Sequence, residues 1–427
     1  MKKFFFVFLL SFVLLFPAST FALNEWTFIC YLVGDDNKSA SMVDSHVEAL
    51  NRMASVGSRK PEYEVLVQFD RPKDSAGIFR WLNLGHNDKS GAIRCTFEQG
   101  KWNVVEKLGE VNMGSPYTLW NCLKWATKIS PAKRYFLIIG GHGSGIFSWR
   151  GAGAVSSNKP GAVEFDPSKF VAYDDTDNDC LTLFELAAVF SAFKERLNNG
   201  RKLDLVAFDS CMPGAIETLY QLRDLCEVIA GSPSTSLIGG MNYKAIVQTI
   251  SKNPKISAES LGQEVAKTYL ESVSRWGTSG EIMGVWRTSK VQELAFSISN
   301  FAIEMITGVK EKGKFKIPNL TMYGGKNRYW DIGRITKSIF NGNVDLSGLS
   351  NGSILKQLAG EILEEAKACT VTVWYSGSFL ADKVGGLSIA WPDEKEYREW
   401  QAFYKALDFS QATKWDEMLD LWVLGQK

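Results

Sequence analysis

Two residues that could form a nucleophile and base pair each follow an apolar, β-rich run. His142 stands in the motif GGHG at 140–143, directly after the run 134–139 (RYFLII), and Cys211 follows the run 202–208 (KLDLVAF). In a parallel sheet, the carboxyl ends of the strands line the crevice where ligands bind. We therefore expect the two side chains to meet at one edge of a sheet, although they are distant in sequence.

A cysteine and a histidine placed in this way could hydrolyse an acyl bond. The thiolate attacks the acyl carbon, and the imidazole keeps the thiol deprotonated and then protonates the leaving amine. The backbone N–H groups of Gly143 and Cys211 are the expected oxyanion hole, because glycine leaves its amide accessible. The alternatives are that Cys211 is a small buried hydrophobe and that His142 belongs to a tight structural turn.

The order of these residues along the chain excludes other nucleophilic hydrolases. His142 is the last of three histidines. A hydrolase ordered Ser, Asp, His would need a Gly-x-Ser-x-Gly motif before it, and there is none. A papain-like order would need one of the three cysteines that precede it, and none has the supporting surroundings. His46 and His86 have polar neighbours and are expected at the surface.

The sequence offers little support for a metal site. There is no Cys-x-x-Cys pair. The seven cysteines are odd in number and sparse for the length of the chain, which does not indicate a disulfide framework. The acidic run 174–179 (DDTDND) could bind calcium. As an EF-hand it fails, because Cys180 stands where the loop needs glycine and Glu185 lies one residue before the position of the bidentate glutamate. The alternative is the start of a helix, with Thr182 and Glu185 as its capping box. We therefore expect no metal and no cofactor, with calcium as the open alternative.

Composition limits the partners of the chain. The 48 Lys and Arg against 47 Asp and Glu give a net charge of +1, so electrostatics give no reason to expect nucleic acid as a partner. With 45% hydrophobic and 22% charged residues, the 427-residue chain is expected to fold around a packed core. Composition leaves the oligomeric state open.

The first 22 residues have the order of a secretory signal peptide. Lys2 and Lys3 precede an apolar core, and the segment closes on Thr20-Phe21-Ala22. An uncleaved membrane anchor is the alternative. No later stretch approaches the length of a membrane span. We expect an exported protein that is secreted, periplasmic or associated with the cell envelope.

The remaining chain alternates between predicted strands and helices, which indicates an α/β sheet with helices on its faces. A hairpin is expected from 79–84 and 101–108, and a long loop from 148–172. The other expected strands before residue 250 are apolar runs at 26–33, 63–69, 134–139, 202–208 and 226–233. Residues 23–250 are thus the predicted core. Residues 251–427 are expected to be helix-rich, with strands at 370–375 and 386–391 that return to the sheet or form a small one.

Several segments together resemble the clostripain-like cysteine peptidases, relatives of caspases and gingipains. Strand-His-Gly followed by strand-Asp-x-Cys, here His142-Gly143 and Asp209-Ser210-Cys211, is the pattern of that wider group. The resemblance also includes WTFICYLVGDDN at 26–37, VQFDR at 67–71, LGEVNMGSPYTLW at 108–120, DSCMPGAIE at 209–217, GLSIAWP at 386–392 and TKWDEML at 413–419. It implies a caspase-haemoglobinase fold and a cysteine endopeptidase that acts on proteins or peptides.

Residue by residue, the resemblance implies His142 as general base and acid and Cys211 as nucleophile. It implies that Asp209 shapes a substrate pocket for Arg or Lys, the alternative being a carboxylate that only ties down its loop. Where many relatives have acidic residues, residues 234–237 read STSL. A catalytically silent exported binding protein on the same fold is the alternative function.

The resemblance also suggests that the segment 148–172 is an activation loop cut by the enzyme itself. Arg150 and Lys159 are then the expected cleavage positions. A surface insertion is the alternative for this segment.

Overall fold

The computed structural model describes residues 23–35, 40–72, 91–146, 169–237, 240–274, 280–317, 322–323, 328–377 and 385–425. The predicted signal peptide, His86, Arg150, Lys159 and most of the predicted loop 148–172 lie outside the described residues.

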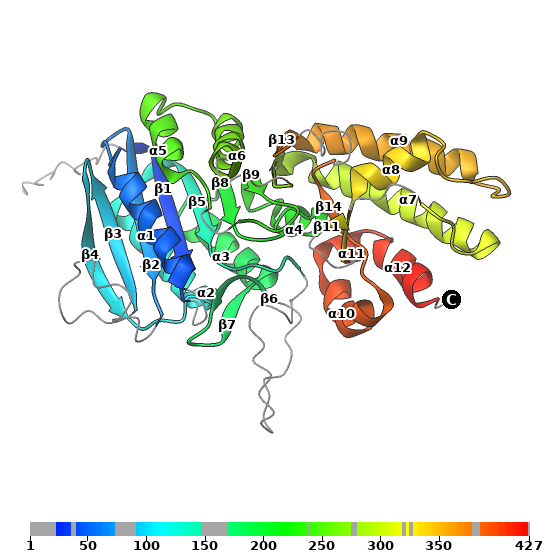
Figure 1. The fold of residues 1–427 in the computed structure, drawn as a ribbon, viewed down its shortest axis with the longest axis horizontal. Coiled ribbons are helices and arrows are strands. Elements are labelled where there is room, and N and C mark those ends of the chain that lie inside the picture. Colours follow the sequence, from blue (N-terminus) through cyan, green and yellow to red (C-terminus); the bar gives the residue numbers. More distant parts are fainter. Residues whose placement is uncertain are drawn as a thin grey trace, which may run out of the picture.

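A nine-stranded sheet forms the centre of the molecule (Figure 1), in the order β13-β10-β9-β8-β5-β1-β2-β3-β4. Its five inner strands run parallel to one another. They are β1 (Asn24–Val33), β2 (Tyr63–Asp70), β5 (Ala132–Gly140), β8 (Leu203–Asp209) and β9 (Cys226–Gly231). Antiparallel strands extend both sides, namely β3 (Ala92–Glu98) and β4 (Lys101–Gly109) on one, β10 (Ile282–Arg287) and β13 (Thr370–Tyr375) on the other. The predicted mostly parallel α/β sheet is confirmed.

The inner strands are apolar because helices cover both faces of the sheet (Figure 1). In β1, Phe28 and Cys30 belong to one hydrophobic cluster, whereas Ile29 and Tyr31 belong to another on the opposite face. The first cluster includes side chains of α1 (Ala40–Ala54), α5 (Tyr243–Lys252) and α6 (Ala258–Ser274). The second includes those of α2 (Pro116–Ile129), α3 (Leu183–Arg196) and α4 (Ile216–Leu222).

The chain after α6 is largely helical, as expected, and packs against the end of the sheet that carries β13 (Figure 1). Its helices are α7 (Val291–Lys312), α8 (Ile332–Phe340), α9 (Gly352–Cys369), α10 (Glu394–Ala406), α11 (Asp408–Ala412) and α12 (Trp415–Leu424), with a short 3-10 helix at Thr288–Lys290. A small sheet joins β11 (Met322–Tyr323), β12 (Tyr329–Asp331) and β14 (Ser388–Ala390). The predicted boundary at residue 250 falls inside α5, and β10 and β13 carry the later region into the main sheet.

Two expectations for the chain path need correction. β4 forms its hairpin with β3 at 92–98, whereas the expected partner 79–84 lies outside the described residues. Gly100 has a φ of 86°, which suits the tight turn between β3 and β4. In addition, the last residues of the predicted loop 148–172 form β6 (Lys169–Asp174), which pairs with β7 (Asp179–Thr182).

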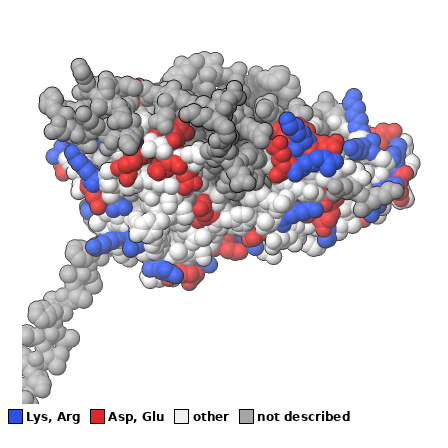
Figure 2. All heavy atoms as spheres, turned by 90° about the horizontal axis from the view of Figure 1, so that it is seen from below, with Lys and Arg blue, Asp and Glu red and all other residues white. Residues whose placement is uncertain are grey.

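On the face drawn in Figure 2, basic and acidic side chains are interspersed over much of the described surface. Within the described ranges, no helix has both the length and the apolar character needed to cross a bilayer.

Candidate active site

His142 and Cys211 lie at the carboxyl ends of two adjacent parallel strands. Gly140 at the end of β5 is paired with Asp209 at the end of β8, and Gly141 N–H donates to the Asp209 carbonyl at 3.2 Å. His142 and Cys211 each lie two residues after this pair. Both are half-buried and line a common pocket. The expected juxtaposition at one edge of the sheet is therefore present.

Close contact between the two loops depends on the glycine beside His142. A Cβ atom added at Gly143 would lie 2.9 Å from the carbonyl oxygen of Cys211 and 3.0 Å from Cβ of Ser210. Both distances are shorter than ordinary contacts, so a larger residue at 143 would push the loops apart. The close neighbour of Gly143 is thus the loop of the cysteine.

β6 supports the loop of His142 from outside the main sheet. Ala172 N–H donates to the His142 carbonyl at 3.0 Å, and Ser144 N–H donates to the Phe170 carbonyl at 3.0 Å. Ala172 has a φ of 61°, a conformation that is uncommon for a residue other than glycine. The position of the histidine loop therefore depends on where β6 lies.

The two expected oxyanion donors are available. Among the described residues, no acceptor is found for the backbone N–H of Gly143 or for that of Cys211. The next residue, Met212, has a φ of 62° and donates its N–H to the Ser234 carbonyl at 2.8 Å. This sharp turn fixes the backbone that carries the Cys211 amide.

Cys211 differs from the other cysteines in its exposure. All seven lie in the described part of the chain; six are buried and Cys211 is half-buried. Its sulfur accepts the backbone N–H of Ser236 at 3.3 Å. Burial raises the pKa of the Cys211 thiol, and the negative charges of Glu281 and Asp209 raise it further, whereas the Ser236 N–H opposes the shift. In this arrangement the thiol is protonated at neutral pH.

Asp209 lines the pocket and also ties down a neighbouring loop. Its Oδ2 accepts the Tyr243 hydroxyl at 2.8 Å and the Met241 N–H at 3.2 Å. Burial raises the pKa of Asp209, while these two hydrogen bonds oppose the change. Asp209 thus anchors the loop that contains Met241 and Tyr243, and its role in substrate binding stays a prediction.

His46 was expected at the surface, and that expectation is wrong. Its side chain is 3% exposed, lines the pocket that holds His142, and packs edge-on against Phe69 with ring centroids 5.8 Å apart. Burial, and to a lesser degree His142, lowers the pKa of His46 to about 3, so the imidazole is neutral. The helical spacing of Val43, His46 and Leu50 is the sequence signal that places His46 on the inner face of α1.

Glu281 is a second acid near Cys211 that sequence reasoning missed. Its carboxylate accepts the Tyr269 hydroxyl at 2.8 Å, and that hydroxyl oxygen accepts the Leu237 N–H at 3.4 Å. Leu237 lines the pocket. No motif marks Glu281, which stands immediately before β10, so only the tertiary structure brings it toward Cys211.

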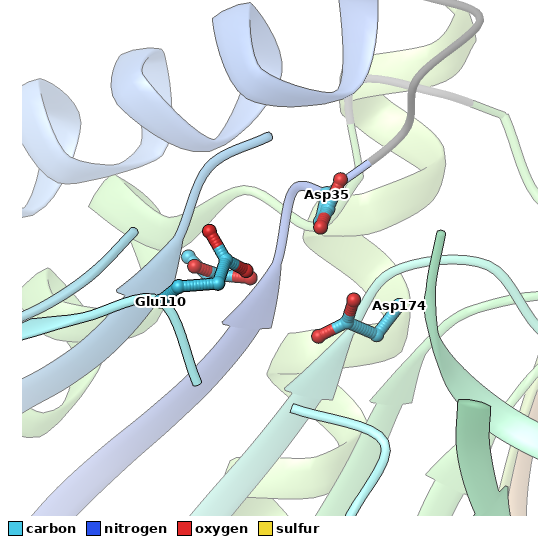
Figure 3. A group of neighbouring side chains, drawn as sticks. Asp35, Glu110 and Asp174 are labelled. Carbon is cyan, nitrogen blue, oxygen red and sulfur yellow. The ribbon is translucent and has the colours of Figure 1, made fainter. Parts of the chain in front are cut away.

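The acidic run 174–179 forms the turn between β6 and β7. The predicted capping box is confirmed, because Thr182 Oγ1 accepts the Glu185 N–H at 3.1 Å and Glu185 Oε2 accepts the Thr182 N–H at 2.9 Å. Asp179 accepts the side-chain amide of Asn112 at 2.7 Å. Within the described part of the chain, Asp174 is the member of this run that joins a wider group of carboxylates close enough to share a metal ion, formed with Asp35, Asp70 and Glu110 (Figure 3).

The chain is similar to known proteins in both sequence and fold. A model of the clostripain family matches residues 30–422. Clostripain from Hathewaya histolytica is 28% identical over 120 residues, which are 27% of this chain and 19% of that protein. The chain therefore aligns with about a fifth of the length of that curated relative.

Two crystal structures have a similar fold. An inactive zymogen C11 protease from Parabacteroides distasonis has a TM-score of 0.63 at 15% identity, covering 92% of this chain and 98% of that one. A secreted C11 cysteine protease from Bacteroides thetaiotaomicron, in complex with an irreversible peptide inhibitor, has a TM-score of 0.61 at 16% identity, covering 92% and 99%. Because the family model spans most of its length, this chain belongs to the clostripain family of cysteine peptidases.

Proposed function

We propose that this chain is an exported cysteine endopeptidase in which Cys211 is the nucleophile and His142 the general base and acid. The observation that carries the proposal is that both side chains line one pocket, beside two backbone amides without acceptors among the described residues. Membership of the clostripain family supports peptide substrates. The charged, apolar and small residues of 1–22 support export, as does the likeness to a secreted protein from Bacteroides thetaiotaomicron.

The proposed reaction proceeds through an acyl-enzyme. His142 takes the thiol proton, and the Cys211 thiolate adds to the carbonyl carbon of the scissile bond. The N–H groups of Gly143 and Cys211 bind the oxyanion that forms. The protonated imidazole then gives its proton to the leaving amine as the C–N bond breaks. Water, deprotonated by His142, attacks the thioester, and loss of the thiolate releases the new carboxyl terminus.

We propose further that the enzyme cleaves after Arg or Lys. Asp209 lines the pocket, and Glu281 supplies the second acid that residues 234–237 lack. Burial raises the pKa of both carboxyls, so each is poorly solvated and would gain from a cationic partner. A substrate guanidinium or ammonium group meets that need.

The described arrangement fits a latent form of such an enzyme. The thiol of Cys211 has a raised pKa, and the pocket has a volume of about 40 Å³, room for a few water molecules only. A substrate side chain would need the pocket wall to move. We therefore propose self-activation by cleavage in 148–172, at Arg150 or Lys159, which would release the chain that leads from the His142 loop into β6.

Hydrolysis of fluorogenic peptides ending in Arg or Lys tests the proposal. Cys211→Ala and His142→Ala should each lower kcat/KM by more than about 10³-fold, because the two groups act as a unit. Cys122→Ala, which removes a buried thiol of α2, is the matched control and should keep its activity. Circular dichroism shows whether each variant is folded. Retention of more than a few per cent of activity in folded Cys211→Ala would refute this mechanism.

The raised pKa of the Cys211 thiol also favours the second candidate, a silent binding protein on the same fold. Wild-type protein that has been treated to cut within 148–172 and still hydrolyses no member of a peptide library would support that alternative. A library digest with a majority of cuts after small or apolar residues would instead reject basic specificity and leave the Cys-His mechanism intact.

A further inference from the structure

The small sheet from the later part of the chain contacts both loops of the candidate active site. It lies between α4 and the C-terminal helices (Figure 1), and its strands β12 and β14 pair with each other in antiparallel fashion. Tyr329 of β12 lies against the loop that carries His142. Ser388 of β14 is bonded to the loop that carries Cys211. One rigid element therefore supports both candidate catalytic side chains from below.

Ser388 donates two hydrogen bonds to a single carbonyl oxygen of the Cys211 loop. Its backbone nitrogen lies 3.0 Å and its Oγ 2.9 Å from the carbonyl oxygen of Gly214. Ala215 also forms a parallel β-bridge with Ser388. Because Ser388 is 1% exposed, solvent cannot replace the bond from its hydroxyl if that hydroxyl is removed.

The turn that follows Cys211 needs support from outside its own backbone. Met212 has a φ of 62°, a left-handed conformation that is costly for a residue with a side chain and persists only where its surroundings hold it. The segment after β9 holds one side of the turn, because the Met212 N–H donates to the Ser234 carbonyl at 2.8 Å. Ser388 holds the other side through the Gly214 carbonyl.

Tyr329 supports the loop of His142 by close packing. A Cβ atom added at Gly145 would collide with the Tyr329 hydroxyl and would lie 2.9 Å from the carbonyl oxygen of Met212. Gly145 is therefore enclosed between β12 and the turn that follows Cys211. Tyr329 is itself buried, so its ring cannot move aside without displacing its neighbours.

The elements on either side of the small sheet hold it in place. Trp415 of α12 donates its indole N–H to the Ala390 carbonyl at 2.9 Å, and the Ala390 N–H donates to Glu217 of α4 at 2.8 Å. Trp415, Ala390 and Glu217 are all buried. β14 is thus bonded to α12 on one side and, on the other, to the helix that follows the Cys211 loop.

We propose that Ser388 and Tyr329 are positioning residues that set the spacing of the two expected oxyanion donors. The turn that Ser388 supports carries the N–H of Cys211, and the loop that Tyr329 supports carries the N–H of Gly143. A donor stabilises the transition state only if it lies where the negative charge will form, so a small displacement of either amide slows acylation. This role rests on the proposed function, whereas the support of the turn does not.

Hydrogen exchange tests the support of the turn without any need for activity. In full-length Ser388→Ala protein, amide exchange of the peptide that spans 211–216 should be at least about fivefold faster than in wild type, because the turn opens more easily. Ser410→Ala is the matched control. It removes a buried hydroxyl of α11 that has no partner among the described residues, and it should exchange like wild type.

Kinetics of protein cleaved within 148–172 test the positioning role. Ser388→Ala should lower kcat for a fluorogenic peptide ending in Lys about tenfold and leave KM within about twofold. A peptidyl aldehyde ending in Lys should bind more weakly by a similar factor, since its adduct with Cys211 places an oxygen between the two donors. Alkylation of Cys211 by iodoacetamide forms no oxyanion, so its rate should stay within about twofold of wild type. A general loosening of the fold would change all of these quantities.

Tyr329→Phe removes the hydroxyl beside Gly145 and should lower kcat several-fold from the side of the His142 loop. Unchanged exchange of 211–216 in Ser388→Ala would overturn the support of the turn. Wild-type kcat in both folded variants, or an alkylation rate that falls as far as kcat, would overturn the positioning role. Faster exchange in Ser388→Ala, in a protein whose cleaved wild type hydrolyses no peptide, would uphold the support of the turn and reject the proposed function, so the two failures are distinguishable.

Discussion

Glu217 should make the stability of this protein fall as pH rises from about 5 to 8. It lies on α4, six residues after Cys211, and its exposed fraction is 0%. Its Oε1 accepts the Ala390 N–H at 2.8 Å and the Tyr404 hydroxyl at 2.9 Å, whereas Oε2 has no partner among the described residues. Burial raises the pKa of Glu217 to about 7, against these hydrogen bonds.

The sign and size of the effect follow from that pKa. The folded state holds a proton on Glu217 between about pH 4.5 and pH 7, and the unfolded state does not, so raising the pH through this window removes stability. A pKa of about 7 in place of 4.5 corresponds to roughly 3 kcal/mol at pH 8. Glu217→Gln keeps the acceptor oxygen and removes the charge. It should therefore match its parent near pH 5 and be more stable at pH 8.

Thermal unfolding of Cys211→Ala and of Cys211→Ala/Glu217→Gln at several pH values measures this difference. At an unfolding entropy of about 2.1 cal/mol/K per residue, roughly 3 kcal/mol corresponds to about 3 °C in Tm for a chain of this length. The exposed Glu195→Gln in α3 is the matched control and should follow its parent at every pH. If the Glu217→Gln melting temperature runs parallel to its parent across the range, the buried carboxyl is not protonated in the folded state and the reasoning fails.

Four further predictions concern the candidate site. Glu281→Gln should lower the pKa of the Cys211 thiol, so iodoacetamide should alkylate the thiol faster at pH 7, and slower alkylation would contradict the effect of Glu281 on that pKa. The same variant should lower kcat/KM for Arg and Lys substrates by more than about tenfold. Asp209→Asn keeps an acceptor for its loop and should lower kcat/KM for the same substrates by more than about tenfold, and unchanged kinetics would remove it from the substrate pocket. The ring signals of His46 should stay constant between pH 5 and 8 in NMR spectra, since its pKa is about 3, and a midpoint in that range would disprove its burial as a neutral group. Purified wild type should contain two fragments that meet within 148–172, whereas Cys211→Ala stays intact; intact and fully active wild type would exclude an activation loop.

Much of the sheet could be predicted because its strands are short apolar runs that end in recognisable turn residues. The runs that became β1, β2, β5, β8 and β9 are buried on both faces, so their composition alone distinguishes them from surface strands. The pairing of His142 with Cys211 followed from the same rule, since parallel neighbours end at one edge. The hairpin partner of β4 could not be chosen in this way, because the segments 79–84 and 92–98 are both short and β-rich.

The residues that sequence reasoning missed depend on tertiary contacts. His46 has polar neighbours in sequence, but the fold turns its side of α1 toward the pocket. Glu281 comes close to Cys211 because it directly precedes β10, which is separated from β8 in the sheet only by β9. Asp35 and Asp70 could be placed at the carboxyl edge of the sheet from the sequence, since each follows or ends a buried strand. Glu110 and Asp174 come close to them only through the packing of β4 and β6.

Active-site labelling followed by mass spectrometry shows whether Cys211 is the nucleophile and whether His142 activates it. Wild-type protein cleaved within 148–172 is treated with a peptidyl ketone that ends in Lys and carries a leaving group, and the modified residue is identified after digestion. We expect one label per chain, on Cys211, at a rate that falls by more than about 10²-fold in His142→Ala. Label on another of the seven cysteines, or on Cys211 at an unchanged rate in folded His142→Ala, would contradict it.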